Sequence, residues 1–183
     1  MYNKKGYSRG VITNLSDAPN ILNPQTGETV FCLENNRVLT YDGDLWMCDD
    51  FIKMTNNSGS ACSACDLMEI ATSGTLSAIK TTGTTIRTIG PAIYGAANGE
   101  FVAIAFKGIY KIKIVNVTSG PANNIGWKVV ASSLGNAGAG INNTAVVAGF
   151  IGWTMERVLF TGSNTPAGHG TFKCLMRGKV EYI

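Results

Sequence analysis

Two alternating runs of hydrophobic residues, FVAIAF and IYKIKIV, meet at Gly108 in the middle of the chain. Phe101–Phe106 is apolar on both faces of an extended chain, which predicts a strand buried on both sides. In Ile109–Val115, Lys111 and Lys113 alternate with apolar residues, so this strand has one wet face and one dry face. A buried strand followed through a tight connection by a half-exposed one predicts an antiparallel hairpin.

Short hydrophobic runs separated by turn residues continue to the end of the chain, and no segment of helical period lies between them. Strands spaced at intervals of about 8–12 residues predict an all-β fold, an antiparallel β-barrel or sandwich. The glycine-rich stretch LGNAGAGINN is expected to be a surface loop. Beyond residue 60 the expected strands are Leu67–Ala71, Leu76–Lys80, Thr84–Ile89, Ala92–Tyr94, Phe101–Phe106, Ile109–Val117, Trp127–Ala131, Ala145–Met155, Arg157–Phe160 and Thr171–Met176.

Upstream, residues 24–51 predict a small three-stranded β-meander with turns at Asn35-Asn36 and Asp42-Gly43-Asp44. Three strands with one apolar face need something to pack on. The residues available for that dry face are Phe31, Leu33, Leu39, Tyr41 and Trp46.

Residues 1–20 show no periodicity and are expected to form an extended N-terminal arm, which is either a disordered tail or a segment that orders across a neighbouring subunit. Composition shifts near residues 52–60, so we divide the chain into the arm (1–20), a meander module (21–55) and a barrel or sandwich domain (56–183).

Composition narrows the function classes. Hydrophobic residues make up 45% of the chain, charged residues only 15%, and 22 of the 183 residues are glycine. A low-charge surface of this kind is typical of secreted proteins, virion shells and adhesive domains. The net charge of +3 is small and dispersed, which argues against nucleic acid as a partner. The longest apolar run, AVVAGFIGW, is about half the length of a membrane helix, and no secretory signal begins the sequence.

Candidate chemistry is sparse, and we expect no catalytic residue, metal or cofactor. Cys62 and Cys65 form a single CxxC pair without a second pair of ligands, so a zinc site or a redox pair is the weaker interpretation and small residues at a turn the stronger one. The only histidine, His169, lies in a glycine-rich segment expected to be a flexible loop. The acidic residues at 42, 44, 49 and 50 lack the spacing of a calcium loop.

Residues 27–46 resemble a short module of tailed-phage fibre and head-appendage proteins. The residues that carry this resemblance are Gly27-Glu28, Val30-Phe31, Asn36-Arg37, Tyr41-Asp42-Gly43 and Leu45-Trp46. A longer resemblance covers roughly residues 55–177. The order DLMEI, IGPAIYG, NGEFVAIAFKGIYKIKI, GWKVVAS, VAGFIGWTMER and GTFKCLMRG is similar to the small β-barrel of tailed-phage capsid decoration proteins.

The resemblance implies a non-enzymatic virion protein, made in the host cytoplasm, that binds the major capsid protein on the outer surface of the head and stabilises it. Such proteins are often homo-oligomers, with a trimer as one arrangement. The expected capsid contact is formed by Tyr2, Lys4, Lys5, Tyr7 and Arg9.

Two alternatives remain open. In one, the chain is a fibre or receptor-binding module in which exposed aromatic residues stack on sugar rings, the candidates being Tyr41, Trp46, Trp127 and Trp153. In the other, it is a cytoplasmic enzyme or redox protein that uses Cys62 and Cys65.

Overall fold

The computed structural model describes residues 8–72, 76–81, 87–115, 128–131, 140–143, 150–155 and 169–177. Within these ranges the chain is built from strands, with one short 3-10 helix, η1 (Leu15–Asn20), so the all-β prediction is confirmed. In chain order the strands are β1 (Ser8–Ile12), β2 (Thr29–Cys32), β3 (Arg37–Tyr41), β4 (Trp46–Met47), β5 (Phe51–Asn56), β6 (Leu67–Ile70), β7 (Ser77–Lys80), β8 (Thr88–Pro91), β9 (Phe101–Ala105), β10 (Lys107–Val115), β11 (Lys128–Ala131), β12 (Gly140–Asn143), β13 (Phe150–Thr154) and β14 (His169–Arg177).

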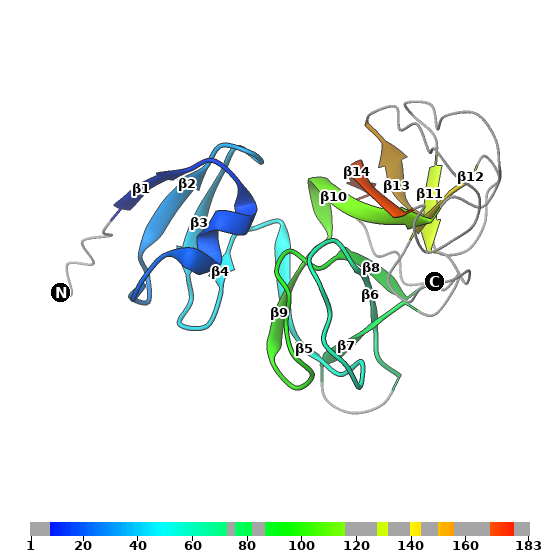
Figure 1. Cartoon of the computed structure of the whole chain (residues 1–183), viewed down its shortest axis with the longest axis horizontal. Helices are drawn as coiled ribbons and strands as arrows, with labels where there is room; N and C mark the ends of the chain where they lie inside the picture. Colours follow the sequence, from blue (N-terminus) through cyan, green and yellow to red (C-terminus); the bar gives the residue numbers. More distant parts are fainter. Residues whose placement is uncertain are drawn as a thin grey trace.

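The first sheet has the order β1-β2-β3-β4 and is drawn in blue at the left of Figure 1. β2, β3 and β4 are the expected antiparallel meander. The segment expected to be an arm adds to it: β1 pairs with β2 in parallel, and η1 follows β1. From Ser8 onward the N-terminal segment is therefore part of this sheet, which we call the N-terminal sheet.

The face of β2 that packs into the core is the opposite of the one we expected. Val30 and Cys32 are buried, whereas Phe31 and Leu33 belong to the other face and Leu33 is 57% exposed. The sequence TVFCL is apolar at nearly every position, so the pattern alone does not fix which alternation faces inward. Pairing with β3 decides it, because Val30 lies opposite the fully buried Leu39.

The second sheet has the order β8-β6-β7-β5-β9 and lies below and between the other two groups of strands in Figure 1. β5 pairs with β9 antiparallel and with β7 in parallel. The prediction that the central apolar run is buried on both faces is confirmed for β9, in which all residues from Val102 to Ala105 are inaccessible to solvent. Of the strand expected at Ala92–Tyr94, only a single bridge from Ala92 to Ile104 is present.

The remaining strands pair in a ring, β10-β12-β11-β13-β14 and back to β10, at the right of Figure 1. The longest ladder joins β10 and β14 over Lys107–Val115 and His169–Arg177. The link between β10 and β12 is one parallel pair, Ile114 with Gly140. The strand expected at Arg157–Phe160 lies outside the described residues.

Two expectations about this region are wrong. Gly140–Asn143, which we assigned to a loop, is β12, because its backbone pairs with β11 and such pairing needs no large side chain. His169 is not in a loop but opens β14, opposite Val115.

The expected hairpin between β9 and β10 is also absent. β9 pairs with β5, and β10 pairs with β14 and β12. One residue, Phe106, separates the two strands, which is fewer than the two residues of a tight hairpin turn. The chain instead bends at Gly108, where φ is +94°, and passes from the second sheet into the ring. The dry face predicted for β10 is confirmed, since Tyr110 and Ile112 are buried.

One cluster of buried side chains connects all three groups of strands. It includes Leu39 from the first sheet, Leu67 and Ala103 from the second, and Ile112 and Cys174 from the ring. A second cluster, around Met68 and Ile104, lies within the second sheet. No helix in the described part of the chain is long and apolar enough to cross a membrane.

Candidate functional site

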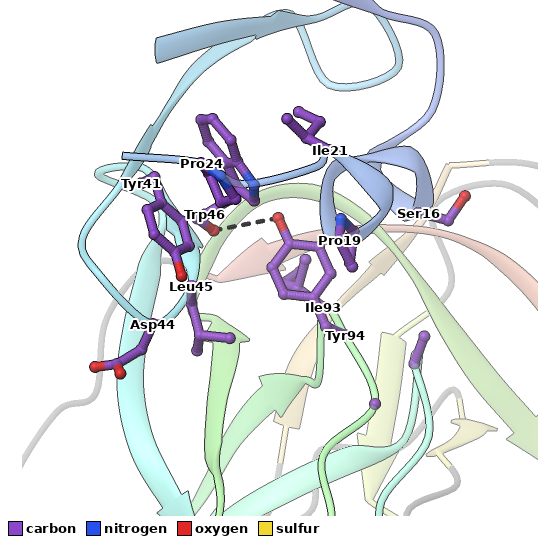
Figure 2. Close-up of a pocket in the computed structure, with 12 residues that line it drawn as sticks. Ser16, Pro19, Ile21, Pro24, Tyr41, Asp44, Leu45, Trp46, Ile93 and Tyr94 are labelled. Atoms are coloured by element: carbon purple, nitrogen blue, oxygen red, sulfur yellow. Dashed lines mark hydrogen bonds between the residues drawn. The ribbon is translucent and has the colours of Figure 1, made fainter. Parts of the chain in front are cut away.

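A pocket of about 440 Å³ lies where the N-terminal sheet meets the second sheet, and we call it the junction pocket. η1 and the segment after it form one wall, the β3–β4 turn forms another, and the connection after β8 closes the third side (Figure 2). This volume is within the range of small-ligand sites, about 300–1,000 Å³. The lining residues are Ser16, Pro19, Ile21, Pro24, Tyr41, Asp44, Leu45, Trp46, Ala64, Ile93, Tyr94 and Gly95.

Three aromatic rings in the pocket are held by backbone hydrogen bonds or by one another. The rings of Tyr41 and Trp46, which are opposite each other on β3 and β4, have centroids 5.4 Å apart and planes tilted by 50°. The Tyr41 hydroxyl donates to the Gly43 carbonyl at 2.8 Å. The Tyr94 hydroxyl donates to the Trp46 carbonyl at 3.1 Å, the dashed line of Figure 2, and burial raises the pKa of Tyr94.

The turn beside the pocket carries two carboxylates, which share the ammonium group of Lys53 on β5. Asp42 Oδ1 accepts hydrogen bonds from the backbone N–H groups of Asp44, at 2.9 Å, and Leu45, at 2.8 Å. Lys53 Nζ donates to both aspartates. Burial opposes the charged form of Asp42, but these hydrogen bonds, led by that from Leu45, outweigh it and lower its pKa. The turn therefore keeps both acids near the pocket with one cation between them.

The structure brings together two of the four aromatic residues proposed for sugar stacking. Tyr41 is half-buried, but Trp46 is only 3% exposed and belongs to the core. Trp153 lies on β13, opposite Lys128 and Leu175, and Trp127 lies outside the described residues. Tyr94 and Ile93 also line the pocket and were not singled out, because their short apolar run carries no pattern distinct from that of a core strand.

Of the five residues expected to contact a capsid, only Arg9 belongs to the described residues. Its guanidinium donates to Glu28 at 2.8 Å and to the carbonyl oxygens of Leu22 and Asn23 at 3.2 and 3.0 Å. Arg9 thus ties β1 to the segment before β2. Tyr2, Lys4, Lys5 and Tyr7 lie outside the described residues.

A second set of polar residues, undetected in the sequence, gathers around Asp50. This carboxylate is 3% exposed and accepts hydrogen bonds from Arg37 Nε at 2.8 Å and from the Tyr110 hydroxyl at 3.0 Å. Lys107 Nζ lies 3.7 Å away. The donors come from β3 and β10, so Asp50 joins the N-terminal sheet to the ring. Asn35 donates to the Tyr110 hydroxyl at 3.5 Å and extends this network.

Cys62 and Cys65 lie in the bridge and turn region before β6. Both thiols are free, and burial raises the pKa of each, so both are protonated near neutral pH. Cys62 is 3% exposed and its backbone pairs with Ala96. Among the described residues no group of three or more histidine, cysteine, aspartate or glutamate side chains is placed to hold a metal ion.

The outer face of the N-terminal sheet carries apolar side chains in register. Val11 on β1 is opposite Phe31 on β2, which in turn is opposite Val38 on β3. Val11 is 62% exposed and Val38 55%. Leu33 follows Phe31 on the same alternation. We call these four residues the outer apolar face.

No protein-family model matches this chain, and no curated protein matches it.

Proposed function

We propose that the chain is a non-enzymatic virion structural protein, a decoration or cement protein that binds the outer surface of a tailed-phage head and stabilises it. The outer apolar face is the observation that carries this proposal. Side chains in register across three strands form a continuous surface, and a continuous apolar surface that faces solvent marks a contact site for another protein.

The composition of the chain supports a contact role. Charged residues are only 15% of the sequence, and the cores of protein interfaces are depleted of charge. A protein that binds the assembled shell and not its free subunits stabilises the shell by mass action, without chemistry. Many copies each contribute a modest contact, and the sum resists disassembly.

The contact proposed for the N-terminal residues is refined by the structure. Arg9 is engaged with Glu28, so it contributes less to an acidic capsid surface than we expected. Tyr2, Lys4, Lys5 and Tyr7 remain in the proposal because they precede β1, the strand that carries Val11 at the edge of the N-terminal sheet. The partner is the major capsid protein.

Substitution of Val38 tests the proposal. Val38→Asp places a charge in the outer apolar face at a residue that is 55% exposed, and it should reduce co-sedimentation with undecorated phage heads at least tenfold. Leu76→Asp is the matched control, because Leu76 is 66% exposed and lies outside this face. Equal binding of both variants, or no binding of the unaltered protein to heads, would contradict the proposal.

A further inference from the structure

We propose that the junction pocket binds an extended, proline-containing segment of a partner protein, with a lysine or arginine next to the proline. This inference goes beyond the proposed capsid role, because it rests on the pocket alone and holds for any protein that supplies such a segment.

The lining of the pocket suits a proline ring. Three aromatic residues, Tyr41, Trp46 and Tyr94, share the pocket with two prolines. Tyr41 is the half-buried ring of the three, and Trp46 and Tyr94, 3% and 6% exposed, form the base of the pocket. Aromatic-lined grooves bind proline-rich segments, because the flat pyrrolidine ring packs against the aromatic rings and the polyproline II conformation is already ordered before binding. Leu45 and Ile93 complete an apolar floor.

The scarcity of free polar groups argues against a sugar as the ligand. A monosaccharide presents several hydroxyls, each of which needs a partner when it is buried. Apart from the two tyrosine hydroxyls, the polar side-chain groups of the lining are those of Ser16 and Asp44 and the indole N–H of Trp46, a residue that is 3% exposed. The hydroxyl protons of Tyr41 and Tyr94 are already donated to the carbonyl oxygens of Gly43 and Trp46.

The negative charge at the edge of the junction pocket favours a lysine or arginine beside the bound proline. Asp44 is the charged residue of the lining, and its side chain is 52% exposed. Asp42 and Asp44 together face one ammonium group, that of Lys53, which leaves the turn with an excess of one negative charge. A lysine or arginine that follows the bound proline would meet this charge, which adds specificity to the contact.

The pocket is formed before the ligand arrives. Hydrogen bonds hold the Tyr41 and Tyr94 hydroxyls to backbone carbonyls, so the rings that would contact proline lose little freedom on binding. Trp46 is fixed by the core beneath it.

The experiment is a titration of the full ¹⁵N-labelled chain with a synthetic peptide of six prolines that has a lysine at each end. We expect saturable shifts of the backbone amides of Leu45, Trp46, Tyr94 and Gly95. The same peptide with glutamate at each end should bind at least fivefold more weakly. A glycine-serine peptide with terminal lysines should cause no shifts at these amides.

Variants connect the shifts to the pocket. Tyr41→Ala removes the half-buried ring of the pocket and should abolish binding, and Asp44→Asn should remove the preference for lysine over glutamate. The matched controls are Asp49→Asn, an exposed acid that is not among the lining residues, and Leu76→Ala, an exposed hydrophobic residue that is also not among them; both should bind like the unaltered chain. If Tyr41→Ala alters the fold, Ile21→Asp, at another half-buried lining residue, takes its place.

Three results would overturn the inference. They are the absence of saturable shifts with the lysine peptide up to about 1 mM, shifts confined to amides away from the pocket, and shifts of the pocket amides by a panel of monosaccharides but not by the peptide. A failure of capsid binding alone would leave the peptide result intact, so the two proposals are tested separately.

Discussion

Gly108 lies directly against Asp50: a Cβ atom added to this glycine would stand 2.9 Å from Asp50 Oδ2 and 2.8 Å from the Tyr110 ring. Its φ of +94° is in the region that favours glycine. The bend that carries the chain from the second sheet into the ring therefore depends on the absence of a side chain at the point where Asp50 is buried.

The substitution Gly108→Ala should be strongly destabilising for both reasons. We expect a loss of about 2–4 kcal/mol in the free energy of unfolding, from the backbone conformation and from the displaced Asp50 and Tyr110 side chains. Gly99→Ala is the matched control, because Gly99 has a φ of +90° but open space around its Cβ position. Urea unfolding of both variants measures the contribution of crowding, and equal losses would show that crowding contributes nothing.

Removing the Tyr110 hydroxyl tests the network around Asp50. Tyr110→Phe takes one hydrogen bond from a buried carboxylate and should lower the free energy of unfolding by about 1.5–3 kcal/mol, as expected for a bond to a charged group. Tyr41→Phe removes a hydroxyl that donates to an exposed backbone carbonyl, and it should cost less than about 1 kcal/mol. A larger loss for Tyr41→Phe would contradict the central role given to Asp50.

Arg9 and Glu28 should make part of the stability depend on pH. The hydrogen bond from Arg9, supported by the backbone N–H of Gln25, lowers the pKa of Glu28 although burial opposes it. Because the folded-state pKa is below that of the unfolded chain, the stabilisation is present above the ordinary glutamate pKa of about 4.3 and is lost as the pH falls through the folded value.

Chemical unfolding of the unaltered chain and of Arg9→Gln measures this effect. The stability difference between them should be constant near neutral pH and should shrink below about pH 4. Lys80→Gln is the control, since Lys80 Nζ donates to the backbone carbonyl of Ala61, and its effect should not change over the same pH range. The hydrogen bonds from Arg9 to the Leu22 and Asn23 carbonyls do not titrate, so part of the difference should remain. A difference for Arg9→Gln that is as large at pH 3 as at neutral pH would argue against the ion pair.

Neighbouring residues on β3 test which face of the N-terminal sheet is buried. Leu39→Ala should cost about 2–5 kcal/mol of unfolding free energy, because Leu39 is completely buried. Val38→Ala, on the outer apolar face, should change it by no more than about 0.5 kcal/mol. Thermal unfolding of both variants is sufficient, and the reverse order would place the opposite face in the core.

Cys174 should be inert to thiol reagents in the folded protein. Burial raises the pKa of Cys174 to about 12, so the reactive thiolate is scarce at pH 8. Mass spectrometry after treatment with iodoacetamide should find Cys174 unlabelled while the half-buried Cys65 is modified, and both should react after unfolding. Modification of Cys174 ahead of Cys65 would contradict its place in the core.

Period-two patterning made the all-β fold and most strands predictable, since runs such as FVAIAF leave little choice between helix and strand. It did not predict which strands pair. β9 and β10 are adjacent in sequence yet belong to different groups, because strand pairing is decided by distant partners, β5 and β14. The sequence also left undecided which face of β2 points inward, since both faces carry apolar residues.

The junction pocket was predictable only in part. Tyr41 and Trp46 stood out as aromatic residues of the meander, but Tyr94 joins them from the connection after β8, and no local pattern connects residues so far apart in the chain. Asp50 stood out in the sequence only as an acidic residue without the spacing of a calcium loop, because nothing near it in sequence shows that Tyr110 and Arg37 converge on it.

The single cluster of buried residues that runs from Leu39 through Leu67 to Cys174 has a mechanical consequence. A force applied at β1 reaches β10 through packed side chains and through the Asp50 carboxylate, without a slack linker to absorb it. Cutting the chain between the first and second sheets would therefore not yield two independently folded parts. A force applied at β1 would be resisted by all three groups of strands together.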